Sequence, residues 1–193
     1  MHYVIGLGNP ENEYGNTRHN AGKIFVKTLG ELAHVTEWKK DPYNKITLAT
    51  GNLKDVSVNF VLSDTYMNES GLSVGSIFKK EHKTVLIVHD DLDLAIGTYK
   101  ISRNKGDGGH NGVTSIQKTL PNEEIIRLRL GISPVDTEGA IRRISSPEQA
   151  EYVLKPFSEN EKEKMLSLVP EIFSMLQVLC IEGVDKAMTL YNK

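Results

Sequence analysis

The chain alternates short apolar runs with segments of helical periodicity, and this alternation limits its fold more than any other feature. The most β-like run covers residues 84–89, where residues 85–88 read Val-Leu-Ile-Val without a polar interruption. An apolar run of strand length is typical of a sheet that is covered on both faces. Strands alternating with helices predict a three-layer α/β/α domain around a mixed, mostly parallel sheet. A length of 193 residues suits one domain, expected over residues 1–193.

The expected elements follow from periodicity and from turn residues. We expect strands over residues 3–7, 46–49, 56–62, 84–89, 99–102 and 125–132, with a turn at Gly51-Asn52 between the second and third. Helices are expected over residues 20–33, 67–78, 111–120 and 138–144. A longer helical region follows Pro156, where Ser158 and Glu161 have the spacing of a capping box.

Composition excludes several classes of protein. Hydrophobic residues make up 39% and charged residues 25%, which is too apolar for a disordered chain. No run approaches the roughly 18 apolar residues of a membrane span, and the N-terminus has no basic segment typical of a signal peptide. We therefore expect a cytoplasmic protein with no membrane contact. The single cysteine, Cys180, excludes an internal disulfide and a cysteine-based zinc site.

Charge is unevenly distributed along the chain. The net charge is −2, but residues 97–143 carry eight Lys and Arg against five Asp and Glu. A local basic surface of this kind can bind phosphates, although a solvated surface has the same composition.

Polar residues of types that take part in catalysis or ligand binding follow the expected strands. They are Asn9, Tyr14, Thr17, Arg18, His19 and Asn20; then Thr65, Tyr66, Met67, Asn68 and Ser70; then His89, Asp90, Asp91 and Asp93; and finally His110, Asn111 and Gly112. In open α/β sheets, ligands bind at the carboxyl ends of the strands. We therefore expect a histidine, an aspartate and three asparagines to meet at one rim.

Such a set suits hydrolysis without a metal. A neutral imidazole accepts a proton from water near pH 7, an aspartate holds its tautomer, and asparagine amides donate to a carbonyl or an oxyanion. Each residue also has a purely structural interpretation. An Asn beside Gly or Pro is typical of turns, an Asp after a strand often caps a helix, and His110 can satisfy its own loop.

The same residues lie in blocks that form a recognisable series. The blocks are Val4-Ile5-Gly6-Leu7-Gly8-Asn9-Pro10, Thr17-Arg18-His19-Asn20-Ala21-Gly22 preceded by Tyr14, Thr65-Tyr66-Met67-Asn68 with Ser70-Gly71, His89-Asp90-Asp91-Leu92-Asp93-Leu94 with Gly97, Gly108-Gly109-His110-Asn111-Gly112 with Ser115-Ile116, and Arg127-Leu128-Arg129-Leu130-Gly131-Ile132. In this order, over about residues 3–157, the chain resembles the bacterial-type peptidyl-tRNA hydrolase family. The C-terminal helices match only in general character.

The resemblance implies an enzyme that hydrolyses the ester joining a peptide to the 3′ end of tRNA, and so recycles the tRNA. It implies His19 as the catalytic base and Asp90 as its carboxylate partner. The residues implied to hold the peptide or ester, or to lie beside the site, are Asn9, Tyr14, Asn68, His110 and Asn111. Those implied at or near the terminal phosphate of tRNA are Lys100, Arg103, Lys105 and Arg129. Peptidyl-tRNA is the one implied partner, and we expect a monomer without cofactor or metal.

The chain departs from the family pattern at three places. Glu11 replaces a glycine after Asn-Pro, so that turn must differ or shift. Ser63-Asp64 replaces a Lys-Pro, which removes one positive charge near the site. Asp107 stands among small residues in the glycine-rich loop, residues 104–109.

Four other interpretations compete with hydrolysis by a His and an Asp. Residues 71–75 fit the Gly-x-Ser-x-Gly nucleophile elbow around Ser73, but no expected strand runs into the first glycine. Gly6-Leu7-Gly8 is a weak dinucleotide signal, because Glu11 occupies the third glycine position. The aspartates at 90, 91 and 93 offer ligands for Mg²⁺. Finally, the fold also serves an RNA-binding module without hydrolysis, as in a plant chloroplast splicing factor of the family.

Overall fold

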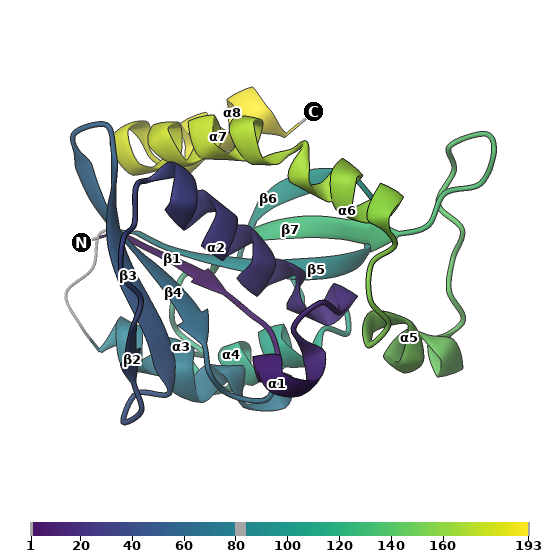
Figure 1. The fold of residues 1–193 in the computed structure, drawn as a ribbon, viewed down its shortest axis with the longest axis horizontal. Coiled ribbons are helices and arrows are strands. Elements are labelled where there is room, and N and C mark those ends of the chain that lie inside the picture. The colour runs from purple at the N-terminus through teal and green to yellow at the C-terminus, as the bar shows by residue number, and fades with distance from the viewer. Residues whose placement is uncertain (1, 80–83, 193) are drawn as a thin grey trace.

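A computed structural model describes residues 2–79 and 84–192. Its centre is a seven-stranded sheet with the order β2-β3-β4-β1-β5-β7-β6 (Figure 1). The strands are β1 (His2–Gly6), β2 (Lys39–Asp41), β3 (Ile46–Leu53), β4 (Val56–Ser63), β5 (Thr84–Ala95), β6 (Tyr99–Arg103) and β7 (Ile126–Ser133).

The sheet is mixed, as expected. Its four central strands, β4, β1, β5 and β7, pair in parallel, and the outer strands β2, β3 and β6 pair antiparallel. In the centre, Val4 pairs with Phe60 on one side and Leu86 on the other. Because parallel strands place their carboxyl ends at one edge, the segments after β1 and the end of β5 share a rim.

Helices cover both faces of the sheet (Figure 1). On one face lie α2 (Ala21–Leu32), α6 (Glu159–Leu166), α7 (Val169–Glu182) and α8 (Val184–Tyr191), and on the other α3 (Ser70–Phe78) and α4 (Asn111–Thr119). Side chains alternate along β5, so Leu86 packs on the α2 side and Ile87 on the α3 side. The α/β/α layering is therefore confirmed.

Short elements at the rim complete the fold. They are α1 (Glu11–Tyr14), the 3₁₀ turns η1 (Arg18–Asn20) and η2 (Met67–Glu69), and α5 (Ser146–Val153). The region expected as one helix over residues 67–78 divides into η2 and α3. The region after Pro156 divides into α6, α7 and α8, and the capping box of Ser158 and Glu161 is confirmed at the start of α6.

Two expectations were wrong. The turn after β3 lies at Lys54-Asp55 rather than at Gly51-Asn52, because β3 stays paired as far as Leu53. Residues 138–144 form no helix; Val135 and Ile141 are instead bridged in an exposed hairpin, and the helix begins at Ser146. Ser145, Pro147 and Glu148 have the spacing of a helix start, so the signal for α5 was present in the sequence.

One segment of the described chain, Glu159–Glu182, is long and apolar enough to cross a membrane by length and composition, since an 18-residue window within it has a mean hydropathy of 1.6. It divides into α6 and α7. Ile172, Met175 and Leu176 of α7 are fully buried against the sheet, which is the position of a core helix.

Candidate active site

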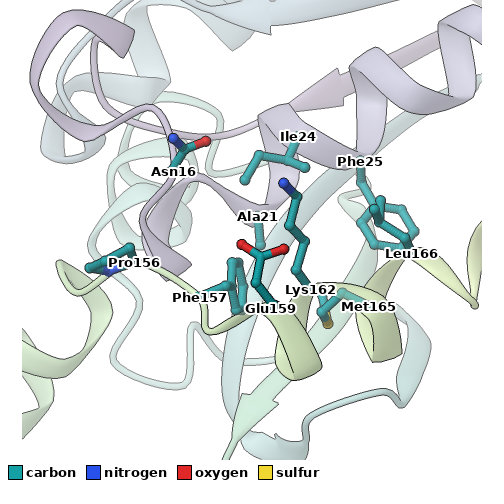
Figure 2. A pocket seen from close by; sticks show the side chains of 10 residues that line it. All are labelled: Asn16, Ala21, Ile24, Phe25, Pro156, Phe157, Glu159, Lys162, Met165 and Leu166. Carbon is teal, nitrogen blue, oxygen red and sulfur yellow. The ribbon is translucent and has the colours of Figure 1, made fainter.

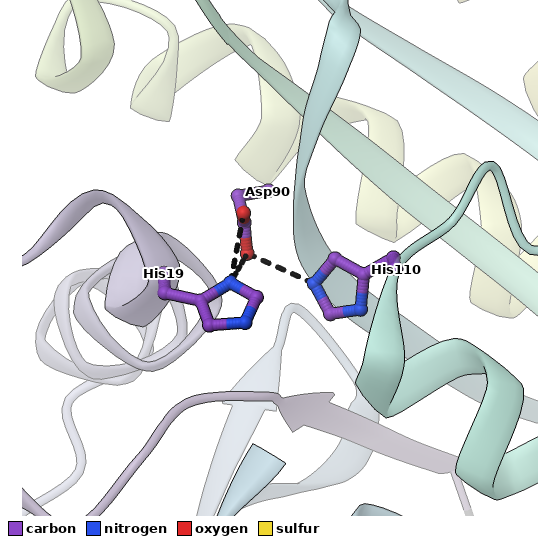
Figure 3. Close-up of side chains that lie close together, drawn as sticks. All are labelled: His19, Asp90 and His110. Carbon is purple, nitrogen blue, oxygen red and sulfur yellow. Dashed lines mark hydrogen bonds and ion pairs between the residues drawn. The ribbon is translucent and has the colours of Figure 1, made fainter. Parts of the chain in front are cut away.

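Three segments far apart in sequence bring His19, Asp90 and His110 together (Figure 3). His19 lies in η1, which follows β1 and precedes α2; Asp90 lies on β5; His110 is the N-cap of α4, directly after the glycine-rich loop. His19 is 8% exposed and Asp90 is 2% exposed. The predicted catalytic pair therefore lies side by side at the rim.

The Asp90 carboxylate accepts from both imidazoles. Nδ1 of His19 lies 3.0 Å from Oδ2 and 3.1 Å from Oδ1, and Nε2 of His110 lies 3.0 Å from Oδ1. An ionised carboxylate only accepts hydrogen bonds, so each imidazole donates with the nitrogen that faces it. Neutral His19 therefore carries its proton on Nδ1 and has Nε2 available to accept one.

His110 has a second, structural contact. Its Nδ1 accepts hydrogen bonds from the backbone N–H groups of Gly112 at 3.1 Å and Val113 at 3.3 Å. These N–H groups at the start of α4 would otherwise lack a partner in the helix. Because Nδ1 is an acceptor, the proton of His110 lies on Nε2 and points to Asp90. His110 thus accepts hydrogen bonds from the backbone at the start of α4 and also donates one to the Asp90 carboxylate.

Electrostatic interactions within the group of His19, Asp90 and His110 shift the pKa values of His19 and Asp90. Burial disfavours the charged form of His19, but the Asp90 charge and its hydrogen bond outweigh burial and raise the pKa of the imidazole. Burial also disfavours the Asp90 carboxylate, yet His19 and His110 hold its pKa well below the usual range. Asp90 is therefore ionised at neutral pH, and it stabilises His19 when His19 takes up a proton.

A third histidine supports the trio from inside the protein. His89 is fully buried, its Nδ1 donates to the backbone oxygen of Asp90 at 2.7 Å, and its ring lies 4.7 Å from that of His110. Burial, with the charges of His110 and Arg127, lowers the pKa of His89 well below its ordinary value. His89 is therefore a neutral support for the β5 backbone at Asp90.

The trio opens into a cavity of about 200 Å³. Its wall is formed mainly by β5, the glycine-rich loop and α5. The lining residues are His19, Asp90, Asp91, Leu92, Asp107, Gly108, Gly109, His110, Asn111, Ser146, Gln149, Ala150 and Val153. The motifs pointed to the first two of these parts. The sequence analysis did not predict that α5 lines the cavity, because it expected a helix at residues 138–144, in the hairpin before α5.

A family profile described as peptidyl-tRNA hydrolase matches residues 3–193. The chain belongs to the peptidyl-tRNA hydrolase family. The peptidyl-tRNA hydrolase of Methylacidiphilum infernorum is 38% identical over 97% of this chain and 96% of its own length. That of Thermodesulfovibrio yellowstonii is 32% identical over 100% of both chains.

Solved structures agree with the family assignment. The crystal structure of peptidyl-tRNA hydrolase from Acinetobacter baumannii has a TM-score of 0.85 and 32% identity, and the match covers 100% of this chain and 94% of that one. The resemblance that the motifs indicate up to residue 157 is thus confirmed, and it extends through the C-terminal helices.

The three asparagines and Tyr14 that the peptidyl-tRNA hydrolase resemblance implies divide between two places. Asn111 lines the cavity, whereas Asn9, Asn68 and Tyr14 do not. Asn68 is exposed on η2, and Tyr14 is half-buried at the end of α1. Asn9 is tied to η2, because its Oδ1 accepts from the backbone N–H of Met67 at 2.9 Å. Its Nδ2 has no acceptor among the described residues and is free to donate to a ligand.

Close packing connects η2, which carries Asn68 and binds Asn9, with the group of His19, Asp90 and His110. A Cβ on Gly112 would lie 2.5 Å from Sδ of Met67 and 3.1 Å from Cε1 of His110. Only glycine leaves room for both neighbours at the first turn of α4. The segment of Met67 and Asn68 is therefore held directly beside His110.

The four basic residues implied for tRNA binding differ in their partners. Lys100 and Arg129 pair across β6 and β7, but Nε of Arg129 donates to Asp91 Oδ2 at 2.6 Å. Arg103 forms ion pairs with Asp185 at 2.9 Å and Glu124 at 3.6 Å. Within residues 2–79 and 84–192, Lys100 and Lys105 have no ion-pair partner.

The departures from the family pattern have structural partners. Glu11 begins α1 and pairs with Lys27 at 2.7 Å. Asp64 lies 3.7 Å from the buried ammonium of Lys23, so a positive charge lies beside this position. Asp107 accepts from Gly109 N–H and from the Thr114 hydroxyl, which ties the glycine-rich loop to α4.

Two of the other interpretations, the nucleophile elbow and the metal site, find little support. Ser73 is fully buried inside α3 and hydrogen-bonded to Ser63 and Ser70, so it does not have the exposed position of the serine in a nucleophile elbow. Of the aspartates at 90, 91 and 93, the first faces the histidines and the second faces Arg129. The ligand atoms of His19, Asp90 and His110 lie within 4.8 Å of one another, close enough for a metal ion, but hydrogen bonds already join them.

A second cavity, of about 230 Å³, lies between the start of α2 and α6 (Figure 2). Its wall is mainly apolar, with Phe25, Phe157 and Met165, and carries Glu159 and Lys162 as its charged residues. It contains none of the predicted site residues.

Proposed function

We propose that this protein hydrolyses the ester bond between a peptide and the 3′ end of tRNA, with His19 as the general base. The observation that carries the proposal is the His19–Asp90 pair facing a cavity in a chain of the peptidyl-tRNA hydrolase family. Release of the peptide returns the tRNA to translation.

The reaction follows from the proton positions. Nε2 of His19 takes a proton from water as the water oxygen attacks the ester carbonyl carbon. Asp90 stabilises the resulting imidazolium through Nδ1. When the tetrahedral intermediate breaks its bond to the tRNA 3′ oxygen, the imidazolium returns the proton to that oxygen. The products are a peptide with a free carboxyl group and a tRNA with a free 3′ hydroxyl.

Side-chain amide groups supply the hydrogen-bond donors that stabilise charge on the ester carbonyl oxygen during the reaction. Asn111 lines the cavity, and Asn9 Nδ2 has no acceptor in the part of the chain that the structure describes, so both are suited to hold the ester carbonyl or the peptide backbone. Asn68 and Tyr14 lie farther along the same rim, where they would contact the peptide. Recognition through backbone groups makes the enzyme tolerant of peptide sequence.

The tRNA phosphate would bind at β6, at the loop after it and at β7. Lys100 and Lys105 have charges that no described acidic residue neutralises, whereas Arg129 and Arg103 must share theirs with acidic neighbours. We therefore assign the main phosphate contacts to the two lysines and supporting contacts to the two arginines. Such binding weakens as salt rises.

The deciding experiment is release of labelled peptide from peptidyl-tRNA by the wild-type protein, with and without EDTA. We expect release in both, because the proposed base and donors are all side chains. Loss of release in EDTA would favour the aspartate or His-Asp-His metal site. Binding of tRNA without any release would favour the RNA-binding module.

We also propose a monomer that acts in the cytoplasm. The exposed large hydrophobic residues are spread over separate elements, as with Leu32 on α2, Leu72 on α3 and Ile181 on α7. No single stripe of the described surface suits a stable dimer. Sedimentation at assay concentration tests the oligomeric state.

A further inference from the structure

Helix α5 forms one wall of the His19 cavity, yet its apolar anchorage is slight. Ser146, Gln149, Ala150 and Val153 face the cavity, and Val153 is the one residue of α5 that is buried. The helix follows an exposed hairpin that projects from the body (Figure 1). The element that α5 packs against most is η1, the turn that carries His19. The Tyr152 hydroxyl donates to the backbone oxygen of Ile132 on β7 at 2.8 Å, so this hydrogen bond and the contacts with η1 hold the wall in place.

Arg18, the residue before His19, contacts α5 itself through Tyr152 and also binds the segment just after α5 and the start of α6. Its NH2 donates to both carboxylate oxygens of Glu161, at 2.9 and 2.7 Å. Its NH1 donates to the backbone oxygens of Lys155 at 3.2 Å and Pro156 at 3.0 Å, just beyond α5. The guanidinium carbon lies 4.3 Å from the centre of the Tyr152 ring.

Backbone contacts align the same two segments. The N–H of Arg18 donates to Lys155 O at 3.1 Å, and Thr17 is bridged to Pro156. Arg18 itself is 8% exposed, so its charge is removed from water and depends on these partners. A planar guanidinium can serve a carboxylate, two carbonyls and an aromatic face together, which an ammonium cannot.

We propose that Arg18 is a positioning residue that latches α5 over the cavity and so sets the wall against which the substrate ester binds. The inference rests on the proposed function, because the cavity is taken to be the ester site. Arg18 connects η1, which carries the proposed base His19, with the cavity wall formed by α5. Loss of the latch would loosen α5 and weaken substrate binding more than it would change the chemical step.

The test compares two latch variants with a matched control. Arg18→Lys keeps the charge and loses the fork, and Glu161→Gln keeps the side-chain shape and loses the carboxylate. Ser158→Ala removes the hydroxyl that caps α6 and leaves the Arg18–Glu161 pair intact. We expect both latch variants to raise KM for peptidyl-tRNA about ten-fold, the factor of one charge-assisted hydrogen bond, with a smaller change in kcat.

Hydrogen exchange supplies the second measurement. Amides of residues 146–153 should exchange faster in Arg18→Lys and Glu161→Gln, while those of β1 and β5 stay protected. Ser158→Ala should lower Tm without changing KM or exchange in α5. An equal rise in KM for all three variants at similar Tm, or unchanged KM and exchange in the latch variants, would overturn the latch. A wild-type protein that releases no peptide would instead overturn the proposed function.

Discussion

Nδ1 of His19 donates to Oδ2 of Asp90 at 3.0 Å, although the two residues lie 71 positions apart in the sequence. The pairing follows from neighbouring parallel strands, because β1 pairs with β5 up to Gly6 and Val88. Asp90 lies two residues beyond this point on β5, and the chain after β1 folds back so that η1 faces it. The contact therefore depends on the register of the sheet and on the turn that precedes α2.

Replacement of His19 by alanine should remove the base. General-base catalysis contributes about 10²–10⁴ in rate, so turnover should fall by at least the lower figure. Binding of tRNA should survive, because the proposed phosphate contacts lie on β6 and the loop after it. Steady-state peptide release and a filter-binding assay with deacylated tRNA measure the two effects. Near-normal turnover by a folded His19→Ala protein would contradict the mechanism.

The pH profile should show the influence of Asp90 on His19. The base works as a neutral imidazole, and its pKa is raised above 6.5, so kcat/KM should fall as pH drops through a value above 6.5. In Asp90→Asn the charge that raises this pKa is gone, and the acid limb should move to lower pH. The maximal rate should fall as well, because the Nδ1 tautomer loses its anchor. An acid limb that stays in place would separate Asp90 from the titrating group.

Two substitutions of His110 should separate its two contacts. Asparagine can still cap α4, whereas alanine cannot, and loss of an N-cap costs about 1 kcal/mol. We expect His110→Asn to keep Tm near that of the wild type and His110→Ala to lower it. Both lose the hydrogen bond to Asp90, so both should reduce kcat. If only the less stable variant loses activity, His110 serves the loop alone.

The basic residues should differ according to their partners. Lys100→Ala should weaken tRNA binding and reduce the slope of log K against log salt by about one contact. Arg103→Ala is the matched control, since Arg103 already pairs with Asp185 and Glu124. Its effect on the slope should be smaller. A larger effect for Arg103 than for Lys100 would mean that the ion pairs break when tRNA binds.

Much of the site could be predicted from the sequence. His19, Asp90 and His110 stand in motifs that follow expected strands, and the strand order of an α/β fold brings such ends together. The wall formed by α5 was not predicted, because the hairpin before it contains apolar residues that imitate a helical pattern. Its start signal at Ser145 and Glu148 is local and was available.

The charges were harder to assign. Charge composition pointed to residues 97–143 as basic, but it did not show that Arg129 donates to Asp91 or that Arg103 pairs with Asp185. Those partners come from other strands and helices. The role of Arg18 was invisible for the same reason, since Glu161 lies 143 positions further along the chain.

The amino-acid sequence by itself determined six of the seven strands, the helices α2 and α4, the capping of α6 and the candidate reactive side chains. Periodicity, capping and motif spacing are properties of neighbouring residues, so they can be read along the chain. The tertiary structure alone decided which carboxylate faces each histidine, which cations stay unpaired and which helix closes the cavity. These depend on strand register and on packing between distant segments, where a shift of one residue places every side chain on the opposite face.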